Sequence, residues 1–180
     1  MQELLNKWNI KLDYNILLSM WNESHRHYHT QNHLLDLIEN INKKIFEQKD
    51  YEKMILCALF HDCVYDPMMS NNEEESANFF MKCCQEKTQD ILDVKQMILD
   101  TKTHESNSKL SEKFNKLDMN IVERDYDSLL EWEKGISLEF SAYDKYLYKE
   151  GRLTFLESIL DKYPNNTGNL LKLIAYVKAK

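Results

Sequence analysis

Residues 54–64 read MILCALFHDCV, a run that is apolar except for the consecutive pair His61 and Asp62. Apolar residues on every side of a segment this long are typical of a helix that is buried on most of its faces. His61 follows Cys57 by four positions and Asp62 follows Ala58 by four, so both side chains project from apolar faces near the end of this helix. An ionised Asp in that position costs several kcal/mol unless a partner or a cation compensates its charge.

A second group of candidate ligands lies upstream, where residues 25–33 read HRHYHTQNH. His29 and His33 are four positions apart and share one face of a helix that begins by residue 29. His33 also starts an apolar stripe that continues through Leu37 and Ile41, so its imidazole is expected to point into the core. Imidazoles gathered near a buried His-Asp pair predict one metal site.

Helical spacing of apolar residues recurs along the rest of the chain, without alternating strand patterns or Asn-Gly hairpin signals. After Pro67, Asn72 and Glu75 have the spacing of a capping box at the start of a helix. The sequence therefore predicts an all-α fold of seven or more helices around a buried metal site. The expected helices cover residues 30–47, 54–64, 72–83, 91–101, 114–122, 129–143, 153–160 and 170–177.

The chain is expected to form a single domain over residues 1–180. It has only 3 Gly and 2 Pro residues and no low-complexity stretch that would mark a linker. A chain of this length is long enough to bury one substantial hydrophobic core.

Composition restricts the partners of the chain. A formal net charge of -7 argues against nucleic acid or an anionic membrane as the main partner, because both attract an excess of Lys and Arg. A small phosphorylated molecule stays compatible, since a local basic pocket can exist on an acidic protein. The N-terminal segment has no leader pattern, and no window reaches the ~18 apolar residues of a membrane span. The 4 Cys residues are typical of reduced, mostly buried thiols. We expect a soluble, cytoplasmic protein.

A further ligand is expected downstream. Asp118 lies on the apolar stripe of Phe114, Ile121 and Val122, so its carboxylate should face the core. Asn120 has mostly charged helical neighbours and is less well placed. A mixed set of imidazoles and carboxylates suits one divalent transition metal, namely Mn²⁺, Fe²⁺, Co²⁺, Ni²⁺ or Zn²⁺, rather than a thiolate zinc site. The predicted ligands are His33, His61, Asp62 and Asp118.

Several short strings occur in a characteristic order over about residues 20–155, most of the chain. They are Arg26-His27-Tyr28-His29 with His33, Phe60 to Pro67, Asn72-Glu73 with Ser76-Ala77, Thr101 to His104, Leu117-Asp118, Glu139-Phe140 and Gly151-Arg152. A His on one helix, a His-Asp pair on a second and a later Asp on a third resemble the HD-domain superfamily of metal-dependent phosphohydrolases. The individual strings are similar to a small branch of predicted members of that superfamily.

This resemblance implies a helical HD fold in which the four predicted ligands hold one metal. The string Tyr28 to His33 is also similar to one in cyclic-nucleotide phosphodiesterases, which implies that His29 is a general acid and His33 a ligand. Glu73 is expected to act in catalysis by orienting a ligand His from beside the metal. The related branch has Asp-x-Asp where this chain has Asp118-Met119-Asn120, so Asn120 is an alternative to Asp118 at the ligand position.

Four residues are expected to bind the substrate. Arg26, Lys102 and Arg152 are candidates to hold phosphate oxygens, because charged donors form strong hydrogen bonds to phosphate. His104 follows Met97 and Thr101 at helical spacing and is assigned to the substrate as well, with a second metal or a backbone carbonyl as its alternative partners. The favoured hypothesis is hydrolysis of a small phosphate ester, for example a nucleotide, by metal-activated water. The alternatives are a cyclic-nucleotide phosphodiesterase, or a non-catalytic HD module that binds a nucleotide or a protein.

Overall fold

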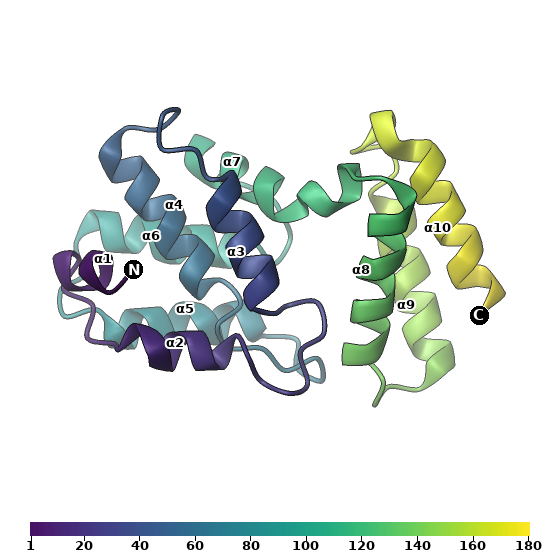
Figure 1. Cartoon of the computed structure of the whole chain (residues 1–180), viewed down its shortest axis with the longest axis horizontal. Helices are drawn as coiled ribbons and strands as arrows, with labels where there is room; N and C mark the ends of the chain where they lie inside the picture. Colours follow the sequence, from purple (N-terminus) through teal and green to yellow (C-terminus); the bar gives the residue numbers. More distant parts are fainter. The chain divides into compact units, whose positions relative to one another are not determined.

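The computed structural model describes residues 1–180 and is all-α, with ten α-helices, two short 3-10 helices and no strand (Figure 1). One isolated backbone bridge joins Ile10 and Cys84. The predicted fold class of seven or more helices is therefore confirmed. The helices are α1 (Gln2–Lys7), α2 (Tyr14–Met20), α3 (Gln31–Asn40), α4 (Gln48–Phe60), α5 (Asn72–Cys83), α6 (Gln89–Asp100), α7 (Lys109–Asp118), η1 (Met119–Glu123), α8 (Tyr126–Glu139), α9 (Lys145–Ser158), η2 (Pro164–Asn166) and α10 (Thr167–Ala179).

The chain divides into two compact units, Met1–Asp118 and Met119–Lys180. The first contains α1 to α7, and the second contains α8 to α10 with the two 3-10 helices. The single domain predicted from the sequence stays a prediction, because two compact units can unfold either together or separately. None of the helices is both long enough and apolar enough to span a membrane.

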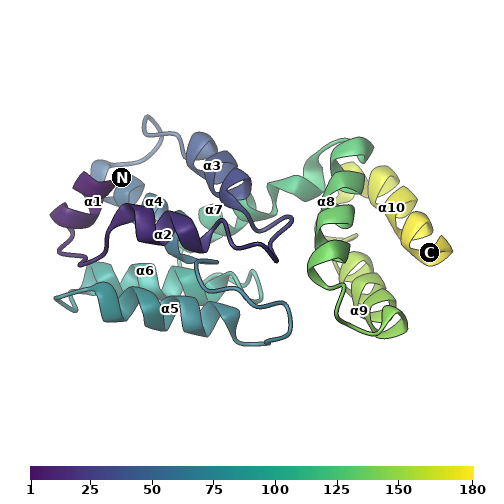
Figure 2. The same cartoon turned by 60° about the horizontal axis from the view of Figure 1, so that its bottom comes forward.

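Helix α4 forms the centre of the first unit. Every residue from Glu52 to Phe60 is buried, and α4 packs against α3, α5, α6 and α7. Figure 2 shows α5 and α6 side by side below it. The largest fully buried side chains around it are Trp21, Phe80 and Phe114, each of a type that removes about 150–250 Å² from water. The expectation of a helix buried on most of its faces is therefore confirmed.

Buried charges at the start of α4 dock the first helix. Glu52 accepts hydrogen bonds from the Lys7 ammonium and, at 2.8 Å, from the Trp8 indole. Burial raises the pKa of Glu52, but these donors more than offset it and lower the pKa overall. These two hydrogen bonds attach the end of the short helix α1, which the sequence did not predict, to α4.

Helix ends differ from the expected ones where side chains bond to nearby backbone. The helix expected over 30–47 ends at Asn40, and Asn42 then accepts the Lys44 N–H in a turn. The predicted capping box is wrong: Asn71 is the N-cap residue. The side chain of Asn72 instead accepts from the backbone N–H of Asp66 and donates to its carbonyl, which ties down the loop after His61 and Asp62.

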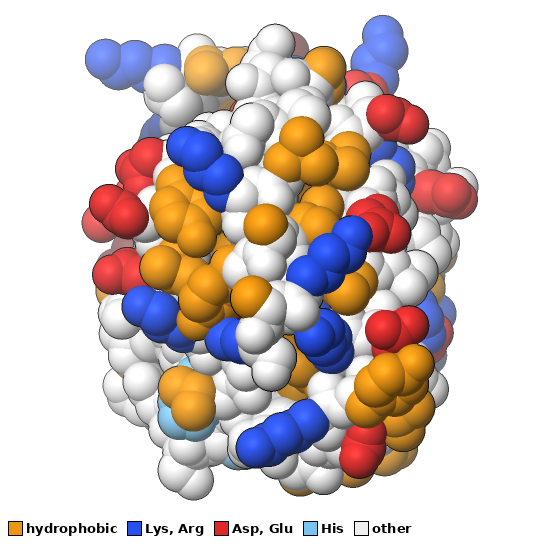
Figure 3. Space-filling view, turned by 90° about the vertical axis from the view of Figure 1, so that its right-hand side faces the viewer, with side chains coloured by type: hydrophobic (Ala, Val, Ile, Leu, Met, Phe, Trp, Pro, Cys, Tyr) orange, Lys and Arg blue, Asp and Glu red, His pale blue; other side chains and the backbone are white.

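The second unit is a three-helix arrangement with its own buried ion pair. Arg152 on α9 donates from Nε to Glu133 on α8 at 2.7 Å, and its guanidinium lies 4.1 Å from the centre of the Trp132 ring. Figure 3 views one face of this unit, where hydrophobic and basic side chains are interspersed. The exposed hydrophobic residues of the unit include Tyr146 and Leu171.

Candidate metal centre

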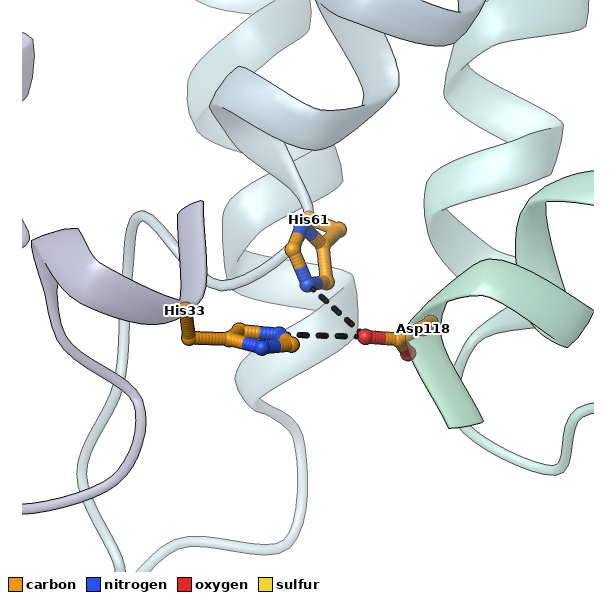
Figure 4. Close-up of side chains that lie close together, drawn as sticks. All are labelled: His33, His61 and Asp118. Carbon is orange, nitrogen blue, oxygen red and sulfur yellow. Dashed lines mark hydrogen bonds and ion pairs between the residues drawn. The ribbon is translucent and has the colours of Figure 1, made fainter. Parts of the chain in front are cut away.

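Three predicted ligands come together from three helices of the first unit. His33 lies in the first turn of α3, His61 directly follows α4, and Asp118 ends α7. Both imidazoles converge on one carboxylate oxygen (Figure 4): Oδ1 of Asp118 lies 3.1 Å from Nε2 of His33 and 3.5 Å from Nε2 of His61. One ligand atom from each residue lies within 4.8 Å of the others. Tetrahedral ligands about 2.1 Å from a divalent ion are about 3.4 Å apart, so these residues can hold a metal.

Asp62 lies beside this group. Its Oδ2 is 3.2 Å from Nε2 of His61, and its side chain is 15% exposed. The position agrees with the expectation that consecutive His and Asp residues face the same interior. Its role as a fourth ligand stays a prediction, because the group that can hold an ion consists of His33, His61 and Asp118. At the end of α7, Asp118 contacts both histidines. Asn120 as the ligand stays an alternative prediction.

The buried imidazole of His61 has one nitrogen with a partner and one without. Nδ1 lies 3.1 Å from the carbonyl oxygen of Ala58, and a carbonyl only accepts, so Nδ1 carries a proton. Nε2 faces the carboxylates of Asp62 and Asp118, at 3.2 and 3.5 Å, but has no hydrogen-bond partner. A lone pair that faces two carboxylates is repelled unless a cation or a proton lies between them.

Charges in the site favour a cation at this point. Burial lowers the pKa of His61, but the negative charges of Asp62 and Asp118 override it and raise the pKa well above its usual value. Burial likewise raises the pKa values of both carboxyls, and the positive charge of His61 lowers them overall. A proton on His61 and a metal ion therefore compete for the same place, and the donor set of two imidazoles and one or two carboxylates fits a divalent transition metal.

Thiols are not part of the donor group. All four cysteines are free; Cys57 and Cys63 are buried on either side of His61 in sequence. Burial raises the pKa of the Cys63 thiol to about 12, which keeps it protonated at neutral pH. The site therefore offers nitrogen and oxygen ligands, as the sequence predicts.

Arg26 holds together the segments that carry the ligands. Its side chain is fully buried, and its guanidinium donates to the carbonyls of His29, Asp62 and Cys63 at 3.0, 2.9 and 3.1 Å. Its remaining donors contact the carboxylate of Glu23. A phosphate contact by Arg26 stays a prediction, and it would require at least one of these hydrogen bonds to break.

The two predicted catalytic residues lie near the ligands. The His29 ring is 6.1 Å from that of His33 and 4.4 Å from that of Tyr65, between ring centres. Glu73 lies in the first turn of α5 and is half-buried. Burial raises the pKa of Glu73, and the negative charge of Asp62 adds to this rise. Their catalytic roles stay predictions.

Two of the predicted phosphate-binding residues form hydrogen bonds to other protein groups. The exposed Lys102 ammonium donates to the Glu74 carboxylate at 2.6 Å and to the Ser70 carbonyl at 2.8 Å. Arg152 belongs to the second unit, where Glu133 binds its guanidinium. A substrate contact by either residue stays a prediction.

His104 lies in the loop between α6 and α7, with Nε2 3.3 Å from Oδ2 of Asp118. Asp100 anchors this loop: its carboxylate accepts from the Asn107 backbone at 3.0 Å, from the Asn107 amide and from the Ser111 hydroxyl at 2.6 Å each, and from Gln96. Burial raises the pKa of Asp100, but these donors lower it overall.

The Asp100→Asn variant is expected to lose about 1–3 kcal/mol of stability at pH 7, because buried donors lose their charged acceptor. A carboxyl with a lowered pKa stabilises the fold above its unfolded value near 4, and that contribution disappears as the pH falls through the folded pKa. Urea unfolding of wild type and variant at pH 7, 5 and 3 should therefore show a difference that shrinks at acidic pH. Glu39→Gln, at an exposed position on α3, is the control. A stability difference between wild type and Asp100→Asn that does not change with pH would contradict the role of the ionised Asp100 carboxylate as an anchor of the loop.

The sequence did not reveal the aromatic wall of the site. The Trp21 ring centre lies 5.4 Å from that of His61, and its indole donates to the Leu59 carbonyl at 3.0 Å. Phe114 contacts His61 from α7, with ring centres 5.5 Å apart. Phe114 could have been found because it precedes Asp118 by four positions, whereas no sequence pattern connects Trp21 to His61.

Comparison of the chain with protein-family models, with curated proteins and with solved structures found no match in any of the three.

Proposed function

We propose that the chain is a metal-dependent phosphohydrolase with an HD-type fold, which acts on a small phosphate ester such as a nucleotide. One observation carries the proposal: Nε2 of His61 is buried, lacks a hydrogen-bond partner and faces two carboxylates. In the proposed enzyme, His33, His61, Asp62 and Asp118 hold one divalent transition metal. The order of motifs along the chain, which resembles the HD-domain superfamily, supports the reaction class.

The chemistry follows from the residues around the ion. When bound, such a metal lowers the pKa of water to supply hydroxide and polarises a phosphoryl oxygen. His29, next to His33, protonates the leaving oxygen of the ester. Glu73, which is half-buried at the start of α5, orients a ligand His from beside the metal.

Metal content and phosphate release test this function together. Wild-type protein is reconstituted with Mn²⁺, Fe²⁺, Co²⁺, Ni²⁺ or Zn²⁺ and analysed beside Asp118→Ala and Asn120→Ala. We expect about one ion per wild-type chain, none in Asp118→Ala and an unchanged content in Asn120→Ala, because Asp118 joins the histidines. Release of phosphate or a monoester is then measured with nucleoside phosphates, cyclic nucleotides and sugar phosphates.

The outcomes distinguish the alternatives. Hydrolysis that requires the metal and is lost in Asp118→Ala supports the proposal, and preference for cyclic nucleotides would narrow it to a phosphodiesterase. A chain that binds metal but hydrolyses none of these esters would defeat the hydrolase assignment in favour of a binding module. A chain that takes up none of the five ions would defeat the metal site as well.

A further inference from the structure

The two oxygens of Asp118 face different partners. Oδ1 points at His33 and His61, at 3.1 and 3.5 Å. Oδ2 lies 3.3 Å from Nε2 of His104, on the other side of the carboxylate. The side chain of Asp118 is 13% exposed and that of His104 is 28% exposed, so the contact lies at the edge of the buried group. One carboxylate thus connects the imidazoles of the metal group to a third imidazole from a loop.

The backbone of His104 has a conformation that is uncommon for residues with a Cβ atom. Its φ is 54°, in the left-handed region, and the only other residue of this kind is Asn9. Asn9 is accounted for by its position just after α1, where left-handed residues commonly end a helix. His104 follows a turn after α6, in a loop where glycine would be less strained.

Neighbouring residues outside the metal group fix the loop of His104. The carboxylate of Asp100, which precedes His104, accepts from the backbone and amide of Asn107, which follows it. The amide of the buried Asn115 donates to the Asp100 carbonyl at 3.4 Å and to the Ser106 hydroxyl at 3.1 Å. These bonds tie the two ends of the loop together, so residues other than His104 hold the loop in place.

We propose that His104 is a positioning residue for Asp118, an inference that rests on the proposed metal function. Nε2–H of His104 donates to Oδ2 and fixes the rotation of the carboxylate about its Cβ–Cγ bond, which is otherwise broad. Oδ1 then stays directed at the ion. Hydrogen bonds of this kind to ligating carboxylates commonly change metal affinity 10–100-fold. The role differs from the substrate contact expected from the sequence.

The full-length protein loaded with Co²⁺ tests this role. Affinity is measured by competition with a chelator, and the visible absorption of the bound cobalt reports the geometry of its ligands. His104→Ala and His104→Gly are expected to bind Co²⁺ about 10–100-fold more weakly than wild type, with an altered spectrum. His104→Gln keeps an N–H donor at a similar reach and should recover most of the affinity. Glu105→Gln, at an exposed position of the same loop, is the control and should match wild type.

Stability separates positioning from a merely structural role. His104→Gly and His104→Ala lose the same hydrogen bond, but only the glycine relieves the left-handed backbone, so its metal-free unfolding midpoint should lie above that of His104→Ala while both bind Co²⁺ equally weakly. Equal affinity and equal spectra in wild type and all His104 variants would overturn the inference. So would two cobalt ions per wild-type chain and one in the variants, because His104 would then be a ligand. A wild-type chain that binds no Co²⁺ would defeat the proposed metal function, and the role of His104 with it.

Discussion

His61→Ala is expected to bind no divalent metal at concentrations that load the wild-type chain with one ion. The substitution removes the nitrogen, Nε2, that faces both Asp62 and Asp118. The loss should exceed the ~100-fold effect of removing an outer hydrogen-bond partner, because a direct ligand disappears. Elemental analysis after reconstitution and dialysis measures it, and any metal-dependent phosphate release should disappear in parallel.

The same substitution has a second consequence for the metal-free protein. Without the imidazolium of His61, two carboxylates remain buried side by side with less compensation, which costs about 3–5 kcal/mol when a buried pair is broken. Circular dichroism and urea unfolding must therefore accompany the metal analysis. His27→Ala, which changes an exposed imidazole in the other histidine string, is the matched control. A folded His61→Ala chain that keeps a wild-type metal content would contradict the site.

Arg26→Met is expected to lower the free energy of unfolding by about 3–5 kcal/mol, because buried carbonyls lose their donor. Methionine retains the apolar stem but leaves the carbonyls of His29, Asp62 and Cys63 without their donor. Each buried group left unpaired costs about 1–3 kcal/mol, and partial access to water reduces the sum. Urea unfolding of the metal-free chain measures the effect.

A surface cation provides the comparison for Arg26. Lys102→Met removes a basic side chain that is exposed and pairs with Glu74, so the unfolding midpoint should change little. Arg26→Lys should fall between the two, because an ammonium keeps the charge but cannot reach three carbonyls in a fixed plane. Equal midpoints for Arg26→Met and Lys102→Met would refute the role of Arg26 in joining the ligand-bearing segments.

Local periodicity made the fold class and much of the site predictable. The apolar run ending in His61 predicts a helix that is buried on most of its faces, because an exposed helix would leave many of these apolar residues in contact with water. In the structure, α4 is buried in this way. His33 and Asp118 are predictable for a related reason: each shares a helical stripe with apolar neighbours three or four positions away. Spacing alone thus placed three candidate ligands in the core.

Helix ends and long-range hydrogen bonds were not predictable in the same way. Asn72 matched a capping pattern, yet its amide bonds to Asp66, because polar side chains at a helix start choose among several nearby backbone groups. The contacts of Arg26 with Asp62 and Cys63 span 36 and 37 positions. The contact of His104 with Asp118 depends on a left-handed turn that no periodic pattern encodes.

The distance along the chain between the candidate ligands bears on how the protein is made. His33 precedes Asp118 by 85 positions, and Asp118 is the last residue of the first compact unit. In the proposed metal-bound protein, an ion held by both would stabilise the folded first unit, because the unfolded chain has no preformed site for it. During translation, the complete ligand set forms only after α7 has left the ribosome. In the proposed metal-bound protein, the ion would therefore join α3 and α4 to α7 only after all three helices have been synthesised.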